Sequence, residues 1–179
     1  LDLCVRGGLG VVEQDGGMEL VDRAGGVRAR VKDRLARACF GALADLAPSC
    51  VPVIEMLERA GDRLGGLDLS NELPAISRLL IDGARAGLLE LRAEPVRVAD
   101  GVPERPALDA LRRAAVARKR PLVDAFHSPC SFPAEHYRLL AAIDGSRSTD
   151  ELAALAHAQT PQLEFPGWIR HLARRGLIR

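Results

Sequence analysis

The chain has 179 residues, of which 47% are apolar, 3% aromatic and 27% charged, and its formal net charge is +1. The apolar fraction excludes wholesale disorder, and the length allows one domain or two small ones. A net charge this close to zero provides no field that could hold an anionic polymer, which argues against bulk binding to nucleic acid or to a membrane surface.

The four cysteines, Cys4, Cys39, Cys50 and Cys130, are scattered along the chain without a CxxC pair. Disulfide frameworks of secreted proteins are far denser in cysteine, so we expect buried free thiols in a reducing cytoplasm. No apolar run reaches the roughly 20 residues that cross a bilayer, and no signal peptide opens the chain. Because the first residue is Leu1, we expect a piece of a longer polypeptide.

Residues 1–31 are rich in glycine and in short apolar alternations, a pattern typical of β-strands. The Asp-Gly-Gly sequence at 15–17 provides turn chemistry between two such runs and predicts an N-terminal β-hairpin. Gly7, Gly8 and Gly10 could cradle a phosphate only between a buried strand and a helix, but a second strand is predicted after them. A nucleotide site is therefore not favoured.

Three helices are predicted next, over residues 32–47, residues 53–60 and from Ser70 to Gly87. Ser70 is expected to cap the third helix, and Gly87 is expected to end it. Apolar residues recur at helical spacing in each, and we expect the following to face a core: Leu35, Cys39, Leu43 and Leu46, then Ile54, Met56 and Leu57, then Leu73, Ile76, Leu80 and Ala84.

After the third helix, residues 88–91 read as a strand, with residues 96–98 as a strand returning beside it. The helix–glycine–strand sequence LLIDGARAGLLELR is similar to WIRHLARRGLIR near the C-terminus, with Gly87 matching Gly176. The match is confined to the glycine and a few apolar positions. It indicates two similar helical units rather than a strict repeat.

A linker is marked by Pro103, Arg105 and Pro106, and we place a domain boundary just before it. Residues 1–100 then form one domain, with a hairpin, three helices and a strand pair. Residues 101–179 form the other.

Residues 107–118 have the periodicity of a helix that buries Leu108 and Leu111. The opposite side is basic and includes Arg112 and Arg113. It is either a docking patch for an acidic partner or a solvated helix face, and the solvated face requires no function.

Residues 132–179 predict three short helices and an extended tail. Ser148 and Glu151 have the spacing of a capping box at the start of the second helix, and Gly176 is placed to end the third. Three helices followed by a strand form the skeleton of a winged helix. The predicted fold class is therefore α+β, mostly helical, with two winged-helix-like units packed together and an N-terminal β-hairpin.

No catalytic centre is recognisable in this sequence. His127, Cys130 and His136 lie close together and suggest zinc, but a structural site requires four ligands and a fourth is not visible. There is no GxSxG elbow and no glycine-rich strand-to-helix motif for a nucleotide or S-adenosylmethionine. We predict no catalytic, metal-binding or cofactor-binding residues in this chain.

The third helix of the C-terminal region carries Arg170, Arg174 and Arg175, which could meet phosphates or the edges of bases. Apolar neighbours leave only one narrow basic strip on this helix. Winged helices also serve as protein-contact modules, so the fold alone does not decide the function. Together with Arg112 and Arg113, these arginines are the predicted contacts to a partner.

The order of features resembles the C-terminal region of bacterial class I S-adenosylmethionine-dependent methyltransferases of the protein-lysine methyltransferase type. That region comprises a methyltransferase regulatory domain followed by a winged-helix region. The stretches that carry the resemblance are 21–60, 79–98 and 105–155, with His127, Asp144, Gly145 and Arg147 at matching places.

The resemblance implies that S-adenosylmethionine binds an upstream domain and that this chain is the non-catalytic regulatory or substrate-recruiting part of a cytoplasmic enzyme. Its partners would be the upstream catalytic domain and a protein substrate or a second copy of the chain, with no nucleic acid and no membrane. Two alternatives stay open: a winged-helix DNA-binding regulator, and a peptide-binding scaffold with a groove between helices and an exposed strand edge.

Overall fold

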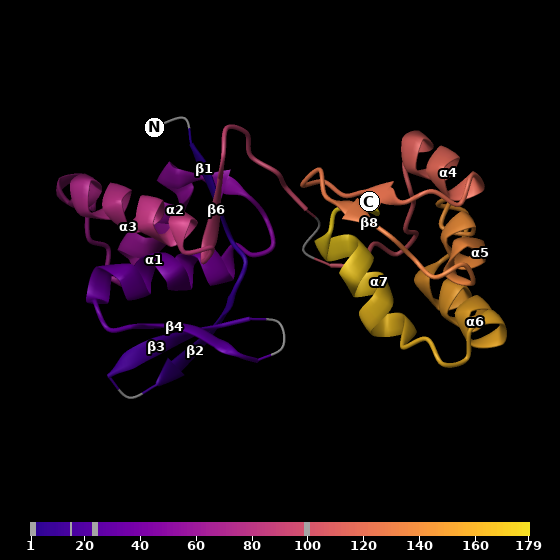
Figure 1. Ribbon diagram of the computed structural model, residues 1–179, viewed down its shortest axis with the longest axis horizontal. Coiled ribbons are helices and arrows are strands. Elements are labelled where there is room, and N and C mark those ends of the chain that lie inside the picture. Colours follow the sequence, from indigo (N-terminus) through magenta and orange to yellow (C-terminus); the bar gives the residue numbers. More distant parts are fainter. Residues whose placement is uncertain (1–2, 15, 23–24, 99–100) are drawn as a thin grey trace. The chain divides into compact units, whose positions relative to one another are not determined.

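The computed structural model describes residues 3–14, 16–22, 25–98 and 101–179, which form two compact units divided between Arg97 and Val98 (Figure 1). The fold is α+β, with helices packed on small antiparallel sheets. No helix among the described residues has the length and apolar character needed to cross a membrane.

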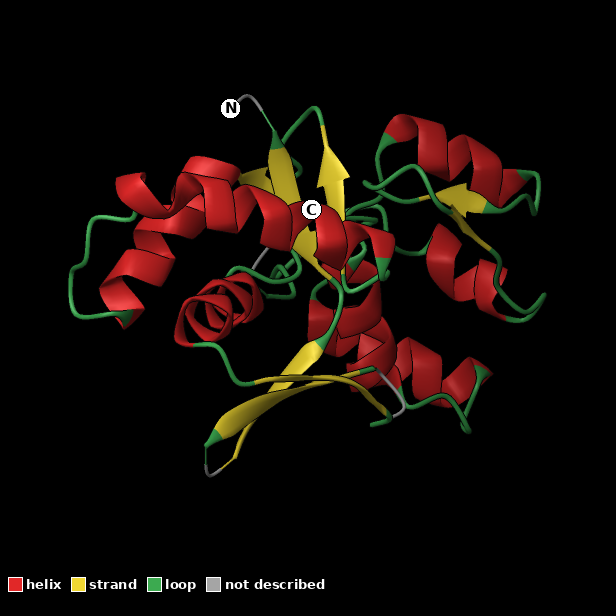
Figure 2. Ribbon diagram, turned by 60° about the vertical axis from the view of Figure 1, so that its left-hand side comes forward, coloured by secondary structure: helices red, strands yellow, loops and turns green. Residues whose placement is uncertain are grey.

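The N-terminal unit contains two three-stranded sheets. In the first, β1 (Cys4–Gly7) lies between β5 (Val51–Pro52) and β6 (Leu89–Arg92), and both pairings are antiparallel. The second is a meander of β2 (Gly10–Gln14), β3 (Gly17–Val21) and β4 (Val27–Val31), seen as a strongly twisted ribbon in Figure 2. The predicted hairpin is β2–β3, and β4 extends it by a third strand.

The turn of that hairpin depends on a glycine. Gly16 has φ +80°, a conformation that glycine adopts without the steric cost that a Cβ brings. Asp15, the other predicted turn residue, lies outside the described residues.

Three helices complete the N-terminal unit: α1 (Arg34–Asp45), α2 (Val53–Arg63) and α3 (Leu73–Arg85). Helix α1 contacts strands of both sheets, β1 and β2, so it ties the two sheets to one core. Most of the predicted apolar face is buried there, including Cys39, Leu43, Met56, Leu57, Ile76 and Leu80.

Three expectations for this unit are wrong in detail. Ile54 is 61% exposed, because α2 turns its other face, with Met56 and Leu57, to the core. Ser70 does not cap α3 but starts a short 3-10 turn, η1 (Ser70–Glu72), that leads into it. Val96 does not return beside β6: it forms an isolated bridge with Cys50, with two backbone hydrogen bonds of 2.8 Å.

The C-terminal unit contains four helices, α4 (Ala110–Ala117), α5 (His136–Ala141), α6 (Thr149–Gln159) and α7 (Phe165–Arg174), and a hairpin of β7 (Leu122–Val123) and β8 (Pro129–Cys130). The three C-terminal helices and the capping box of Ser148 and Glu151 are confirmed. Helix α4 starts later than predicted, because Ala107 and Leu108 are used in strand pairing. Leu111, expected inside, is 81% exposed.

The two units share one topology. In the N-terminal unit, β1 is flanked by β5, which precedes α2, and by β6, which follows α3. In the C-terminal unit, the segment 107–108 bridges Asp144, which precedes α6, and Ile178, which follows α7. In each unit, therefore, an early strand lies between two later strands. A pair of helices connects these two later strands along the chain.

The last helix of each unit also ends in the same way. Gly87 and Gly176 have φ +68° and +60°, and the residue after each donates its amide to a carbonyl five positions back, over 2.9 Å in both cases. This is the hydrogen bond of a glycine-terminated helix. It directs the chain back toward the central strand of its unit.

Replacing Gly176 by alanine should destabilise the chain more than the same change at Gly87. Each variant forces an L residue into a left-handed conformation, which costs about 1–2 kcal/mol. A Cβ at Gly176 would also lie 2.6 Å from the Cβ of Ala125, whereas one at Gly87 meets nothing within 4 Å. We expect a further loss of about 1–3 kcal/mol at Gly176 from this overlap. Urea denaturation measures both, and equal losses would contradict the prediction.

The alkaline stability of the chain should depend on Cys39. Burial, reinforced by the nearby charge of Asp33, raises the pKa of the Cys39 thiol from 9.0 to about 11. The unfolded chain therefore loses this proton first, and stability that is fully present below pH 9 is lost as the pH rises toward 11. We expect a loss of about 2 kcal/mol from this group. Urea titrations across this pH range should show a smaller loss in Cys39→Ala, and an identical loss would refute the assignment.

Candidate functional site

Helix α7 positions the basic residues of the C-terminal unit. Its first turn is capped by the Glu164 carboxylate, which accepts a hydrogen bond from the Gly167 amide over 2.6 Å. Its buried stripe consists of Phe165, Ile169, Leu172 and Ala173. Because this stripe faces the core, Arg170 and Arg174, one turn apart, are left exposed to solvent.

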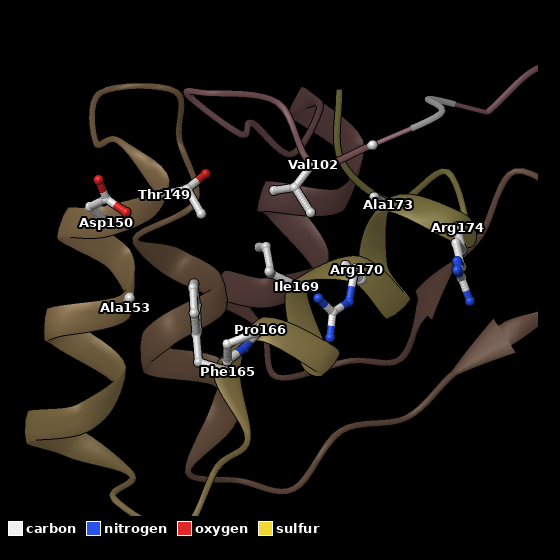
Figure 3. A pocket seen from close by; sticks show the side chains of 11 residues that line it. Val102, Thr149, Asp150, Ala153, Phe165, Pro166, Ile169, Arg170, Ala173 and Arg174 are labelled. Carbon is white, nitrogen blue, oxygen red and sulfur yellow. The ribbon is translucent and has the colours of Figure 1, made fainter.

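A pocket of about 370 Å³, which we call the α7 pocket, opens between α6 and α7 (Figure 3). In Figure 3, Thr149 and Asp150 lie on the α6 side and Arg170 projects from α7 on the other side. Its apolar lining is Val102, Ala153, Phe165, Pro166, Ile169 and Ala173. The pocket therefore combines an apolar interior with a charged rim.

Hydrogen bonds at the start of α6 hold the mouth of the α7 pocket in place. The Thr149 hydroxyl donates to the carbonyl of Pro103 over 2.9 Å, and the Thr149 amide donates to the carbonyl of Glu104 over 2.9 Å. The capping box engages the amides of Ser148 and Glu151. These bonds occupy donors at this helix start, so the charge at the pocket comes mainly from side chains.

The charges around the α7 pocket define what it can bind. Arg170 and Arg174 form no ion pair within the described part of the chain, and both line the pocket. Asp150 contributes a single opposing charge. Among the described residues of the lining there is no histidine or cysteine, and the Thr149 hydroxyl donates to a carbonyl. This arrangement suits binding of an apolar group next to a carboxylate or phosphate.

Arg175, the third arginine predicted on this helix, has a different environment. Its Nε lies 2.6 Å from Oδ2 of Asp124, whose side chain is only 2% exposed. Its Nη2 donates to the Cys130 sulfur over 3.0 Å. The other oxygen of Asp124 accepts the amides of Phe126 and Ser128 over 2.9 and 2.8 Å. Arg175 therefore joins α7 to the β7–β8 hairpin.

The two predicted contact arginines of α4 also differ from one another. Arg112 lies 2.7 Å from the carboxylate of Asp109 and donates to the carbonyl of Val123 over 3.0 Å, so it fastens α4 to β7. Arg113 is exposed. Figure 1 shows the helices α4 and α7 apart within the unit, while Arg112 and Arg175 reach the adjacent residues Val123 and Asp124.

The residues that suggested zinc do not gather. His127 lies in the hairpin turn with φ +60°, and Cys130 is bound to Arg175. His136 instead packs edge-on against Trp168, with ring centroids 5.8 Å apart. Within the described ranges, no three His, Cys, Asp or Glu side chains come together as metal ligands.

Sequence patterns alone did not locate the α7 pocket. Arg170 and Arg174 were found from the helical period of α7, which separates them from the buried stripe. Val102 and Thr149 belong to segments distant in sequence, and the hydrogen bonds of Thr149 to Pro103 and Glu104 bring these two segments together. No short-range signal encodes that contact.

Removal of Arg175 should destabilise the chain, whereas removal of Arg170 or Arg174 should not. Arg175→Met leaves the buried Asp124 carboxylate uncompensated, for which we expect a loss of about 3 kcal/mol in the free energy of unfolding. Arg170→Ala and Arg174→Ala should stay within about 0.5 kcal/mol of the parent chain. Urea denaturation of the three variants tests this, and similar losses in all of them would show that Arg175 has no special structural role.

No protein-family model matches this sequence, and neither does any curated protein. Solved structures do match. The chain is similar to PKMT2 from Rickettsia typhi in complex with AdoHcy, with a TM-score of 0.77, 10% identity and coverage of 99% of this chain and 42% of that one. A second structure of PKMT2 from the same organism matches with a TM-score of 0.75 and 9% identity, and the match covers 99% of this chain and 43% of that one. The chain thus spans less than half the length of these solved chains, and it shares the fold of the part of PKMT2 that it matches.

Proposed function

We propose that this chain is the non-catalytic regulatory or substrate-recruiting C-terminal region of a bacterial S-adenosylmethionine-dependent protein methyltransferase. The observation that carries the proposal is the likeness of 99% of the chain to less than half of PKMT2. Residues 1–100 would be the methyltransferase regulatory-type domain, and residues 101–179 the winged-helix-like domain.

The winged-helix part of the proposal is supported by the repeated topology. In each unit, a helix, a short strand, two further helices, a glycine stop and a final strand follow one another, and both outer strands pair with one central strand. This order fits the winged-helix skeleton. The insertions differ between the units: strands β2, β3 and β4 lie between β1 and α1 in the N-terminal unit, whereas α4 and the β7–β8 hairpin lie between the segment 107–108 and α5 in the C-terminal unit.

The proposed roles of this chain and of the upstream domain are based on the chemistry of the α7 pocket. Its exposed arginines and apolar lining are suited to binding, and its lining provides no pair of nucleophile and base. S-adenosylmethionine would bind an upstream domain, which is the first expected partner. A protein substrate or a second copy of the chain would be the other, and Arg113, Arg170 and Arg174 are the exposed candidates for such contacts.

The first test separates binding of the methyl donor from recruitment of the acceptor. Isothermal titration of residues 1–179 with S-adenosylmethionine should give no measurable heat of binding. The parent polypeptide should bind the methyl donor with or without residues 1–179, but without them it should lose at least about tenfold in kcat/KM for a protein acceptor. Tight binding of S-adenosylmethionine by residues 1–179 alone, or full activity without them, would overturn the proposal.

The DNA-binding alternative has a test of its own. It now relies on Arg170 and Arg174, since Arg175 is engaged by Asp124. A salt-dependent shift of a random duplex, abolished in the Arg170→Ala and Arg174→Ala double variant, would favour it. No shift at low salt would leave protein contact as the use of this surface.

A further inference from the structure

A second groove lies in the N-terminal unit, along helix α2. It has a volume of about 360 Å³ and is lined by α2, by residues 66–69 and by the start of α3. We call it the α2 groove. It shares no residue with the α7 pocket.

The α2 groove forms because the chain after α2 folds back tightly onto the helix. The amides of Gly66 and Leu67 both donate to the carbonyl of Gly61, over 3.0 and 3.2 Å. A Cβ at Gly61 would lie 2.6 Å from the carbonyl oxygen of Leu67, so only glycine permits this approach. The returning segment makes one wall of the groove, and α2 makes the other.

The groove presents apolar side chains that the fold does not need for its core. Ile54 on α2 is 61% exposed and Leu67 on the returning segment is 55% exposed, although both line the same groove. Leu57 and Leu69 are buried beneath them. Single exposed apolar residues are ordinary, but two that line the same groove together with buried leucines form a surface that a partner can cover.

The charge of the groove is of one sign. Its lining includes Glu58, Asp62 and Asp68, and none of the described residues that line it is a lysine, arginine or histidine. Over the described ranges, no ion pair engages any of these three carboxylates. Hydrogen bonds from the hydroxyl and the amide of Ser70 lower the pKa of Asp68, so its carboxylate form is favoured further.

Two other carboxylates of the same unit are neutralised by arginines. Glu55, also on α2, is bound by Arg97 through a hydrogen bond of 2.9 Å, and Asp45 is bound by Arg63 through two such bonds. On α2, the acidic side chains without an ion pair to a described residue are therefore the two that line the groove.

The acids on α2 work against the helix that carries them. Glu58 and Asp62 are four residues apart, so they lie on the same side of α2 and repel each other. Asp62 also lies in the last turn, where the helix dipole favours a cation. Each effect destabilises the helix slightly, and a bound cation would reverse both.

We propose that the α2 groove binds a protein segment in which lysine or arginine alternates with leucine-type side chains. The apolar side chains would cover Ile54 and Leu67, and the cations would lie against Glu58, Asp62 and Asp68. Charge complementarity selects this occupant, because an acidic segment would meet three carboxylates with no cation to offset them. The inference depends on the groove alone and holds whether or not the chain serves a methyltransferase.

The test measures binding of a labelled peptide to the full chain of 179 residues. The probe is a short fluorescein-labelled peptide that alternates lysine with leucine, and fluorescence anisotropy gives its Kd at low salt. The triple variant Glu58→Gln, Asp62→Asn, Asp68→Asn should weaken binding at least about tenfold, as expected for the loss of several exposed ion pairs. Ile54→Ser should weaken binding about fivefold through lost apolar contact.

The matched control neutralises three exposed acids that do not line the groove, with Glu94→Gln, Glu104→Gln and Glu135→Gln. Both triple variants have the same net charge. Binding that survives in the control and falls in the groove variant supports the proposal. An equal loss in both, no loss in Ile54→Ser, tighter binding of a peptide with glutamate in place of lysine, or no binding to the parent chain would each overturn it.

Discussion

Antiparallel pairing of one early strand with two later ones is the constraint on which each unit depends. Strand β1 holds β5 and β6, and the segment 107–108 holds Asp144 and Ile178. The helix pair between the two outer strands is thereby fixed at both ends. The glycine after each last helix turns the chain back to the central strand. Without that pairing, neither α2–α3 nor α6–α7 would have a defined position, and neither would the surfaces they carry.

The corresponding helix pair lines a hollow with apolar walls in each unit, but the charges around the two hollows are opposite. In the N-terminal unit, α2 and the start of α3 present carboxylates around an apolar groove. In the C-terminal unit, α6 and α7 present Arg170 and Arg174 around an apolar pocket. One architecture thus gives two sites with opposite electrostatic preference. The near-zero net charge of the whole chain conceals this separation, so the argument against an overall field does not extend to local sites.

The sequence allowed the helices and their caps to be predicted because these depend on neighbours a few residues apart. The period of α7, the capping box at Ser148 and the glycine stops at Gly87 and Gly176 are all of this kind. Errors occurred where distant segments compete for a residue. Leu108 pairs with Ile178 and is therefore not part of α4. Val96 pairs with Cys50 and not with β6. Arg175 was grouped with its exposed neighbours because Asp124 is far from it in sequence. The α2 groove was missed because Ile54 was assigned to the core.

The position of the central strands has a consequence for biosynthesis. Cys4 leaves the ribosome well before Arg92, with which it can pair only when the N-terminal unit has been translated almost to its end. Leu108 likewise can pair with Ile178 only after almost all of the C-terminal unit has been synthesised. Until then each nascent unit exposes an unpaired strand and bare helix faces, a state prone to aggregation. Each unit should therefore complete its sheet late during synthesis, and nascent chains should depend on chaperone protection until the closing strand emerges.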